Sequence, residues 1–220
     1  MNVVTPPRGG LYVIADEEAL RPRDVTDSLL AIAESGVEWI QLRAKTLATD
    51  DLYRLVEKAT ALLGELERAP KLWLNDRVDI ALLHPVDGVH LGQSDLPPEE
   101  ARRLLGAKMW IGLSTHSLEQ AAEAELNPAV DVVACGPVYP TVSKQNPDPV
   151  IGLRDLARLR EVVQKPLVAI GGIDAGRLGE VLAAEVDAAA MIGAVCRAPD
   201  IPDACRRLLA LSSKEAHDEE

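Results

Sequence analysis

Two aspartates, each just past the end of an apolar run, could together hold a metal ion. Asp76 follows the run at 71–74, and Asp95 follows the run at 88–92. If these runs form neighbouring parallel strands, their ends lie about 5 Å apart, which is the spacing of paired strands. Two carboxylates at that spacing could share one hard cation such as Mg²⁺, and a cation held in this way usually faces a phosphate ester. The pair therefore predicts a magnesium site at which a phosphorylated molecule binds.

Asp76 also has a purely structural interpretation. Aspartate is a favoured N-cap residue, so Asp76 could instead cap a helix over 77–83. The presence of Asp95 on the next strand favours the metal site over the cap. The neighbouring Asn75 fits either a direct ligand or a residue that orients one by hydrogen bonding.

Basic residues near another strand end could bind the anion. Arg43 and Lys45 are two residues apart in an extended segment, so both charged heads point to one side. That arrangement suits the clamping of a pyrophosphate. The alternative is a pair of solvated surface charges.

Three further segments could contribute to anion binding. The loop at 141–144 reads Thr-Val-Ser-Lys, a weak signal alone because such loops are often plain turns. The glycines at 171–172 and Gly193 follow the seventh and eighth apolar runs. In barrels, bare backbone N–H groups after these strands often cradle a phosphate; two tight turns are the alternative.

The elements that must position these residues are eight apolar runs that alternate with helix-patterned segments. The runs are nearly continuous, as in strands covered on both faces, and lie at 11–16, 39–43, 71–76, 88–93, 109–114, 131–137, 166–172 and 188–193. Such alternation is the signature of an α/β fold of the (β/α)₈ TIM-barrel type. A doubly wound open sheet is the alternative, but it usually has fewer strands. In a barrel, the C-terminal ends of the strands form one rim, where these polar residues gather.

Helical signals fill the intervening segments. Apolar residues recur at helical spacing between 52 and 63 and again between 178 and 182. Prolines suit the first turn of a helix over 98–105. Ser117 followed by Gln120 has the form of a capping box.

Length and composition fit one globular domain. The 220 residues are 47% hydrophobic and 26% charged, which predicts a single domain over 1–220, with the barrel at 11–212 and a flexible tail at 213–220. No apolar stretch reaches the roughly 18 residues of a membrane span. The N-terminal residues lack the basic-then-apolar pattern of a secretion signal, so a cytoplasmic protein without a membrane partner is expected.

Charge and cysteine content narrow the partners. The net charge of −12 argues against nucleic-acid binding. The site residues, and not the charge, predict small-molecule substrates. The oligomeric state stays open, a homo-oligomer included. Buried free thiols are expected for the three cysteines, an odd number without CxxC spacing: Cys135, Cys196 and Cys205. Three histidines without ligand spacing are interpreted as structural or supporting residues: His84, His90 and His116.

No residue set predicts a covalent nucleophile, because no cysteine lies beside a histidine and no Ser–His–Asp arrangement is evident. The expected rim offers a pair of carboxylates for one metal ion, two basic residues that could clamp an anion, a loop with a lysine, and backbone N–H groups that could hold a phosphate. These amount to two anion sites around one metal. The simplest chemistry is a transfer in which metal-bound pyrophosphate leaves and a second, phosphorylated molecule attacks.

At these residues the chain resembles the thiamine phosphate synthase family. The resemblance runs from about Leu11 to about Ala198 and rests on several motifs in the right order: QLRAK (41–45), the 75–95 segment, GLSTHS (112–117), CGPVYPTVSK (135–144), VAIGGI (168–173) and MIGAV (191–195). The family couples 4-amino-2-methyl-5-hydroxymethylpyrimidine pyrophosphate to a thiazole phosphate, forming thiamine phosphate. The resemblance implies a dissociative mechanism: pyrophosphate departs first, and the thiazole nitrogen captures the pyrimidine methylene cation.

The resemblance also implies roles for individual residues. Mg²⁺ would be held by Asp76 and Asp95. The expected catalytic residues are Arg43, Lys45 and Lys144, of which Lys144 would touch the pyrophosphate. The pyrimidine pyrophosphate would be bound by Gln41, Leu42, Arg43, Ala44, Lys45, Asn75 and Ser114. The thiazole phosphate would be bound by Thr141, Val142, Ser143, Gly172, Ile192 and Gly193.

Two positions depart from the family pattern. Ser143 stands where the family often has threonine, so the hydroxyl group is kept. Gly193 stands where the family usually has serine, so this chain lacks a hydroxyl group at that position. A lost hydrogen bond to a charged group costs roughly 1.5–3 kcal/mol if nothing replaces it, so at most weakened thiazole-phosphate binding is expected.

Two alternative functions remain at this stage. The thiazole tautomerase branch of the same superfamily isomerises the thiazole phosphate and needs no pyrophosphate site, so the clamp and the acidic pair argue against it. A non-catalytic sensor of phosphorylated ligands is a rival of another class. The sequence shows no appended effector or DNA-binding segment that would favour a sensor.

Overall fold

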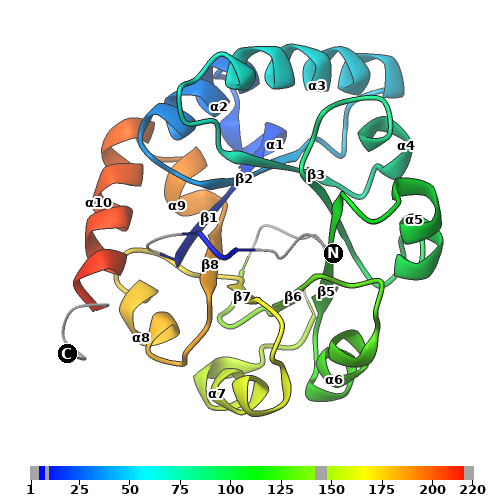
Figure 1. The fold of residues 1–220 in the computed structure, drawn as a ribbon. Helices are drawn as coiled ribbons and strands as arrows, with labels where there is room; N and C mark the ends of the chain where they lie inside the picture. Colours follow the sequence, from blue (N-terminus) through cyan, green and yellow to red (C-terminus); the bar gives the residue numbers. More distant parts are fainter. Residues whose placement is uncertain (1–4, 8–9, 142–147, 216–220) are drawn as a thin grey trace.

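The chain folds into a closed barrel of eight parallel strands surrounded by helices (Figure 1). The structure is a computed structural model that describes residues 5–7, 10–141 and 148–215. Each strand pairs with its neighbours in sequence, and the barrel closes between the first and the last strand. The predicted (β/α)₈ TIM barrel is thereby confirmed, and the alternative of an open sheet is wrong.

The strands coincide with the eight apolar runs but end earlier than most of them. Their bounds are β1 Leu11–Asp16, β2 Trp39–Arg43, β3 Lys71–Asn75, β4 Gly88–Leu91, β5 Trp110–Thr115, β6 Val132–Cys135, β7 Leu167–Ile170 and β8 Ala188–Met191. The last residues of several runs, such as Asp76 and 171–172, therefore leave the ladder. They belong to the rim that follows the strands, where the candidate site lies.

The helices form an outer ring around the barrel (Figure 1). Their bounds are α1 Glu17–Leu20, α2 Val25–Glu34, α3 Thr49–Gly64, α4 Val78–Ala81, α5 Pro98–Leu105, α6 Leu118–Leu126, α7 Gly152–Val162, α8 Leu178–Leu182, α9 Gly193–Cys196 and α10 Ile201–Glu215. The helix over 98–105 begins and ends as predicted. Because α10 reaches Glu215, the first residues of the predicted tail are helical.

Local sequence signals account for several helix boundaries. Ser117 caps α6 by accepting a hydrogen bond from the N–H of Gln120, as the capping box predicts. The return bond differs, because Gln120 Oε1 accepts from the N–H of His116 at 2.8 Å. The capping motif thus also anchors His116, which directly follows β5.

The core has two parts because successive strand residues face opposite sides of the barrel wall. Outward-facing residues such as Val13 and Leu42 pack against the helices. Inward-facing residues fill the barrel, with large rings on β1–β3 and small side chains on β6–β8: Tyr12, Trp39, Trp73, Val132, Ala134, Val168, Ala188 and Ala190. This pairing of large with small residues closes the interior below the rim.

None of the helices in the described part of the chain has both the length and the apolar character needed to cross a membrane.

Candidate active site

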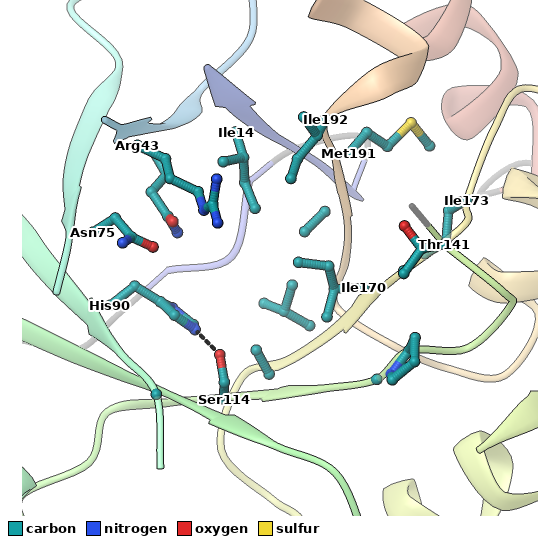
Figure 2. A pocket seen from close by; sticks show the side chains of 18 of the residues that line it. Ile14, Arg43, Asn75, His90, Ser114, Thr141, Ile170, Ile173, Met191 and Ile192 are labelled. Atoms are coloured by element: carbon teal, nitrogen blue, oxygen red, sulfur yellow. Dashed lines mark hydrogen bonds between the residues drawn. The ribbon is translucent and has the colours of Figure 1, made fainter. Parts of the chain in front are cut away.

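A cavity of about 730 Å³ opens at the C-terminal ends of the strands. Residues from every strand end contribute to its wall. Figure 2 shows polar residues, Arg43, Asn75 and His90, on one side and Thr141 with Ile173 on the other. Since β3 and β4 lie across the barrel from β7 and β8, the cavity has an acidic side and a glycine-rich side.

The acidic side is built by Asp76 and Asp95. The ladder between β3 and β4 continues one step past its end, where the Asp76 N–H donates to the His90 carbonyl at 2.9 Å. Asp95 is turned inward because its Oδ2 accepts from the N–H of Gly92 at 2.7 Å. The two carboxyl groups are close enough for Asp95 to raise the pKa of the Asp76 carboxyl group. The structure thus brings together the two residues expected to hold a cation.

Asp76 lies in an unusual electrostatic environment. Burial raises the pKa of its carboxyl group, and the neighbouring Asp95 raises it further, while Lys45 opposes both. Lys45 Nζ lies 2.9 Å from Asp76 Oδ2. Asp76 caps no helix, because α4 begins at Val78 with Arg77 as its N-cap residue, so the capping interpretation is wrong.

Strand β2 delivers alternate residues to the cavity. Gln41, Arg43 and Lys45 line it, whereas Leu42 and Ala44 do not. These two pack on the outer side of the barrel wall, so any contact of theirs with a substrate would involve the backbone.

The basic side chains on and just after β2 are ion-paired, and Lys45 is the more exposed of the two. Arg43 Nη1 pairs with Asp16 Oδ2 at the end of β1, and Lys45 pairs with Asp76. Gln41 donates to the hydroxyl of Tyr12 at 2.8 Å on the cavity floor. The interpretation as a solvated surface charge is therefore wrong for Arg43, whereas Lys45 is ion-paired but still half exposed. Both are held in position, although each is already paired with an acid.

A neutral histidine and a hydroxyl connect β4 and β5. His90 Nε2 lies 2.9 Å from Ser114 Oγ (Figure 2). Burial lowers the pKa of His90 to about 4, against a smaller opposing effect of Asp95. The ring lies over Gly112, where a Cβ atom would collide with it. His90 therefore supports Ser114 as an uncharged hydrogen-bonding partner.

The glycine-rich side is formed by the turns after β6, β7 and β8. Thr141, Gly172, Ile192 and Gly193 all line the cavity, while the predicted residues Val142, Ser143 and Lys144 lie outside the described residues. Gly172 has φ +66°, and a Cβ atom there would lie 2.6 Å from the Pro140 carbonyl oxygen. This turn therefore requires glycine, and it exposes bare backbone to the cavity.

The acidic pair suits Mg²⁺. Among the described residues no group of three acidic, histidine or cysteine side chains converges in the way a complete metal cage would. Mg²⁺ is commonly bound by only one or two carboxylates, with water and substrate phosphate oxygens as its other ligands. Two interacting carboxylates that follow the neighbouring strands β3 and β4 match that pattern, because a shared cation would relieve their repulsion.

Several residues of the cavity wall were not predicted from the sequence: Tyr12, Ser94, Gln120, Asp148, Asp174 and Arg197. His116, predicted to be structural or supporting, also lines the wall. Its Nδ1 lies 2.7 Å from the Gly136 carbonyl oxygen and its Nε2 lies 3.4 Å from Asp148 Oδ2. Arg197 stands one helical turn after Gly193, but that spacing alone does not predict a place at the cavity wall.

Known proteins match this chain over most of its length. The model of the family "Thiamine monophosphate synthase" matches residues 11–195. A thiamine-phosphate synthase of Syntrophomonas wolfei subsp. wolfei is 39% identical over 198 residues, which cover 90% of this chain and 93% of that protein. A thiamine-phosphate synthase of Albidiferax ferrireducens is 40% identical over 204 residues, covering 91% and 90%.

A solved structure agrees with these sequences. Thiamine phosphate pyrophosphorylase from Pyrococcus furiosus is 36% identical and superposes with a TM-score of 0.84, covering 94% of this chain and 97% of that one. Family model, relatives and structure thus agree over nearly the whole barrel. The chain therefore belongs to the thiamine monophosphate synthase family and is a transferase enzyme.

Proposed function

We propose that this enzyme transfers the pyrimidinylmethyl group of 4-amino-2-methyl-5-hydroxymethylpyrimidine pyrophosphate to a thiazole phosphate, releasing pyrophosphate and forming thiamine phosphate. The observation that carries the proposal is the convergence of Asp76, Asp95 and Lys45 on one side of a cavity whose other side is a glycine-lined turn. One cavity would then hold two anions with room between them for two rings. The names of the relatives point to the same reaction.

The acidic side would bind the pyrophosphate. Asp76 and Asp95 would hold Mg²⁺, which when bound would neutralise charge on the leaving pyrophosphate. Lys45 would exchange its ion pair with Asp76 for a contact to the anion, and Arg43 would remain oriented by Asp16. By the family resemblance, Asn75 and Lys144 would also contact the pyrophosphate-bearing substrate.

The glycine-rich side would bind the thiazole phosphate. Gly172 lies in a turn fixed by Arg177, whose Nη1 donates to the Gly172 carbonyl at 2.6 Å. Because Gly171 and Gly172 line the cavity without side chains, an anion bound there would meet the backbone of the turn. Thr141 would add a hydroxyl, and Ser143 would add another by the family resemblance.

The chemistry would need positioning more than proton transfer. The carbon–oxygen bond to pyrophosphate breaks with its electron pair leaving on the pyrophosphate oxygen. The thiazole nitrogen lone pair then forms the new carbon–nitrogen bond. Apolar side chains between the two anion sites, Ile14, Ile170 and Ile192, would hold the rings and keep water from the cation (Figure 2).

No protein nucleophile is required in this scheme. All three cysteines are buried, and burial raises the pKa of each thiol, to about 11 for Cys196 and about 12 for Cys205. Ser114 is hydrogen-bonded to a neutral His90 that has no carboxylate partner among the described residues. Ser114 would therefore contact the pyrimidine substrate rather than attack it.

Incubation of the purified protein with both substrates, with and without Mg²⁺, tests the proposal. A synthase releases pyrophosphate and forms thiamine phosphate in equal amounts, and removal of Mg²⁺ with a chelator stops both. Isomerisation of the thiazole phosphate without pyrophosphate release would indicate a tautomerase. Binding of phosphorylated ligands without turnover of either would indicate a sensor.

A further inference from the structure

In the turn after β8, the Arg197 side chain lies against Gly193, and neither the metal site nor the steps proposed above involve this arginine. Gly193 does not adopt a left-handed backbone conformation, so its φ does not call for glycine. A Cβ atom at this position would collide with Nη1 of Arg197, one helical turn later. The space that a side chain of residue 193 would fill is therefore taken by a guanidinium group.

Arg197 differs from the other arginine and lysine residues of the cavity wall in lacking an acidic partner. Arg43 is paired with Asp16, and Lys45 is paired with Asp76. Within the described ranges, the Arg197 guanidinium makes no hydrogen bond or ion pair. In a chain with a net charge of −12, a basic group at the wall of a cavity that no carboxylate neutralises is available to an anionic ligand.

We infer that Arg197 binds the phosphate of the thiazole substrate, and that Gly193 is glycine because the guanidinium needs its space. The inference rests on the proposed function and names a further substrate-binding residue for it. The planar fork of a guanidinium offers two parallel N–H donors to phosphate oxygens, which suits this role better than a point charge would.

The position of Arg197 decides which of the two anions it binds. It follows β8 and lines the cavity together with Ile192 and Gly193, on the side that also carries Gly172. The acidic pair that would hold the pyrophosphate follows β3 and β4, across the barrel. A guanidinium beside the turns after β7 and β8 thus faces the phosphate of the thiazole substrate and not the leaving pyrophosphate.

This arrangement changes the expectation for Gly193. The loss of a hydroxyl at this position predicts at most weakened phosphate binding. A charge-assisted bond from Arg197 is stronger than a bond from a neutral hydroxyl and offsets that loss. Because Arg197 is exposed, the contact is also open to screening, so the affinity for thiazole phosphate falls with increasing salt.

The first test is the variant Arg197→Gln, which keeps length and polarity but removes the charge. The KM for thiazole phosphate is expected to rise by about 10- to 100-fold, the effect of losing a hydrogen bond to a charged group. The kcat and the KM for the pyrimidine pyrophosphate are expected to stay near their wild-type values. Arg206→Gln on the outer helix α10 makes the same change in net charge away from the cavity and serves as the control.

The second test is the variant Gly193→Ser, which pushes the guanidinium aside. In the wild-type background it should raise the KM for thiazole phosphate. In the Arg197→Gln background it should have little effect, because the guanidinium group that the serine displaces is already absent. Equal effects of the serine in both backgrounds would overturn the link between the two residues. An unchanged KM for thiazole phosphate in Arg197→Gln would overturn the binding role itself.

Calorimetric titration with thiazole phosphate alone separates this inference from the proposed function. If the wild-type protein forms no thiamine phosphate, the proposed function fails. The titration still tests Arg197, because loss of affinity in Arg197→Gln and not in Arg206→Gln supports the site without turnover. Full synthase activity with unchanged thiazole-phosphate affinity in Arg197→Gln would leave the proposed function standing and overturn the inference.

Discussion

The carboxylates of Asp76 and Asp95 are held close together against their mutual repulsion. Burial and the neighbouring Asp95 both raise the pKa of Asp76, and only Lys45 offsets them. Asp76 also has a left-handed backbone with φ 62°, a conformation that few residues other than glycine, asparagine and aspartate adopt readily. Two unfavourable features at one residue are typical of a functional site rather than of a structural one.

Asp76→Asn tests the importance of that charge. Asparagine tolerates the left-handed backbone, so the fold should be kept while the negative charge is lost. Turnover is expected to fall about 100-fold or more, the effect of removing one preorganised electrostatic group. Steady-state kinetics at saturating Mg²⁺ measure it, with the exposed Asp79→Asn as a control of equal charge change. Near-wild-type turnover in Asp76→Asn would refute the metal-binding role.

His90 predicts a pH dependence of stability. Its folded pKa of about 4 lies below the unfolded value of 6.5, because burial penalises the charged ring. The unfolded chain therefore binds a proton first, and stability is lost as the pH falls from about 6.5 toward about 4. Between about pH 7.5 and pH 5 the loss is on the order of 2 kcal/mol.

Urea unfolding at these two pH values measures this contribution. On acidification the wild-type protein should lose more stability than the His90→Gln variant, by on the order of 2 kcal/mol. The comparison isolates His90, because other titrating groups contribute to both proteins alike. Equal losses in the two proteins would show that His90 is not buried in its neutral form.

The sequence identified most of the residue types at the site but not their partners. Asp76, Asp95 and Asn75 were predicted because each stands beside the end of an apolar run. The ion pair between Arg43 and Asp16 could not be read in the same way, since the pairing depends on the register of β1 against β2. Arg197 was missed because its role depends on an absent side chain at Gly193.

At the scale of elements, one glycine lets β4 and β5 carry a histidine into the barrel. Gly112 pairs with His90 across the ladder, and the imidazole ring fills the space over it. A side chain on β5 at this position would displace the ring, and with it the hydrogen bond to Ser114. The positions of Ser114 and His90 therefore depend on a residue with no functional group.

Gly112→Ala tests this dependence. The added methyl group should cost about 1–3 kcal/mol of stability, as overpacking of a core does. Gly64→Ala is the matched control, because Gly64 ends α3 and a Cβ atom there would meet nothing within 4 Å. That control should be neutral or stabilise the protein by up to about 1 kcal/mol. Equal stabilities of the two variants, measured by urea unfolding, would contradict the packing argument.

The order and type of the elements could be predicted from the sequence, whereas several boundaries could not. Continuous apolar runs and helical stripes indicate a barrel because both depend on local periodicity. The run at 166–172 was predicted too long, because Gly171 and Gly172 are apolar in composition but turn away with positive φ. The bond between Gln120 and His116 shows the same limit, since it extends the capping box beyond the helix.

At the scale of the whole molecule, the closed barrel predicts cooperative unfolding. Because every strand has two neighbours, no part of the barrel can detach without breaking two ladders. The single domain predicted over 1–220 should therefore unfold in one transition. Far-ultraviolet circular dichroism reports the helices, and fluorescence reports the tryptophans inside the barrel, Trp39 and Trp73. Separate transitions by the two probes would reveal independent units.

Closure of the barrel has a consequence for biosynthesis. Leu11 near the start of the chain pairs with Ala189 near its end. A ribosome therefore releases β1 long before its second neighbour exists, and the nascent polypeptide carries an unpaired edge for most of translation. Exposed edges of this kind attract other chains, so the growing polypeptide, more than the finished enzyme, is the stage at which this protein is prone to aggregate.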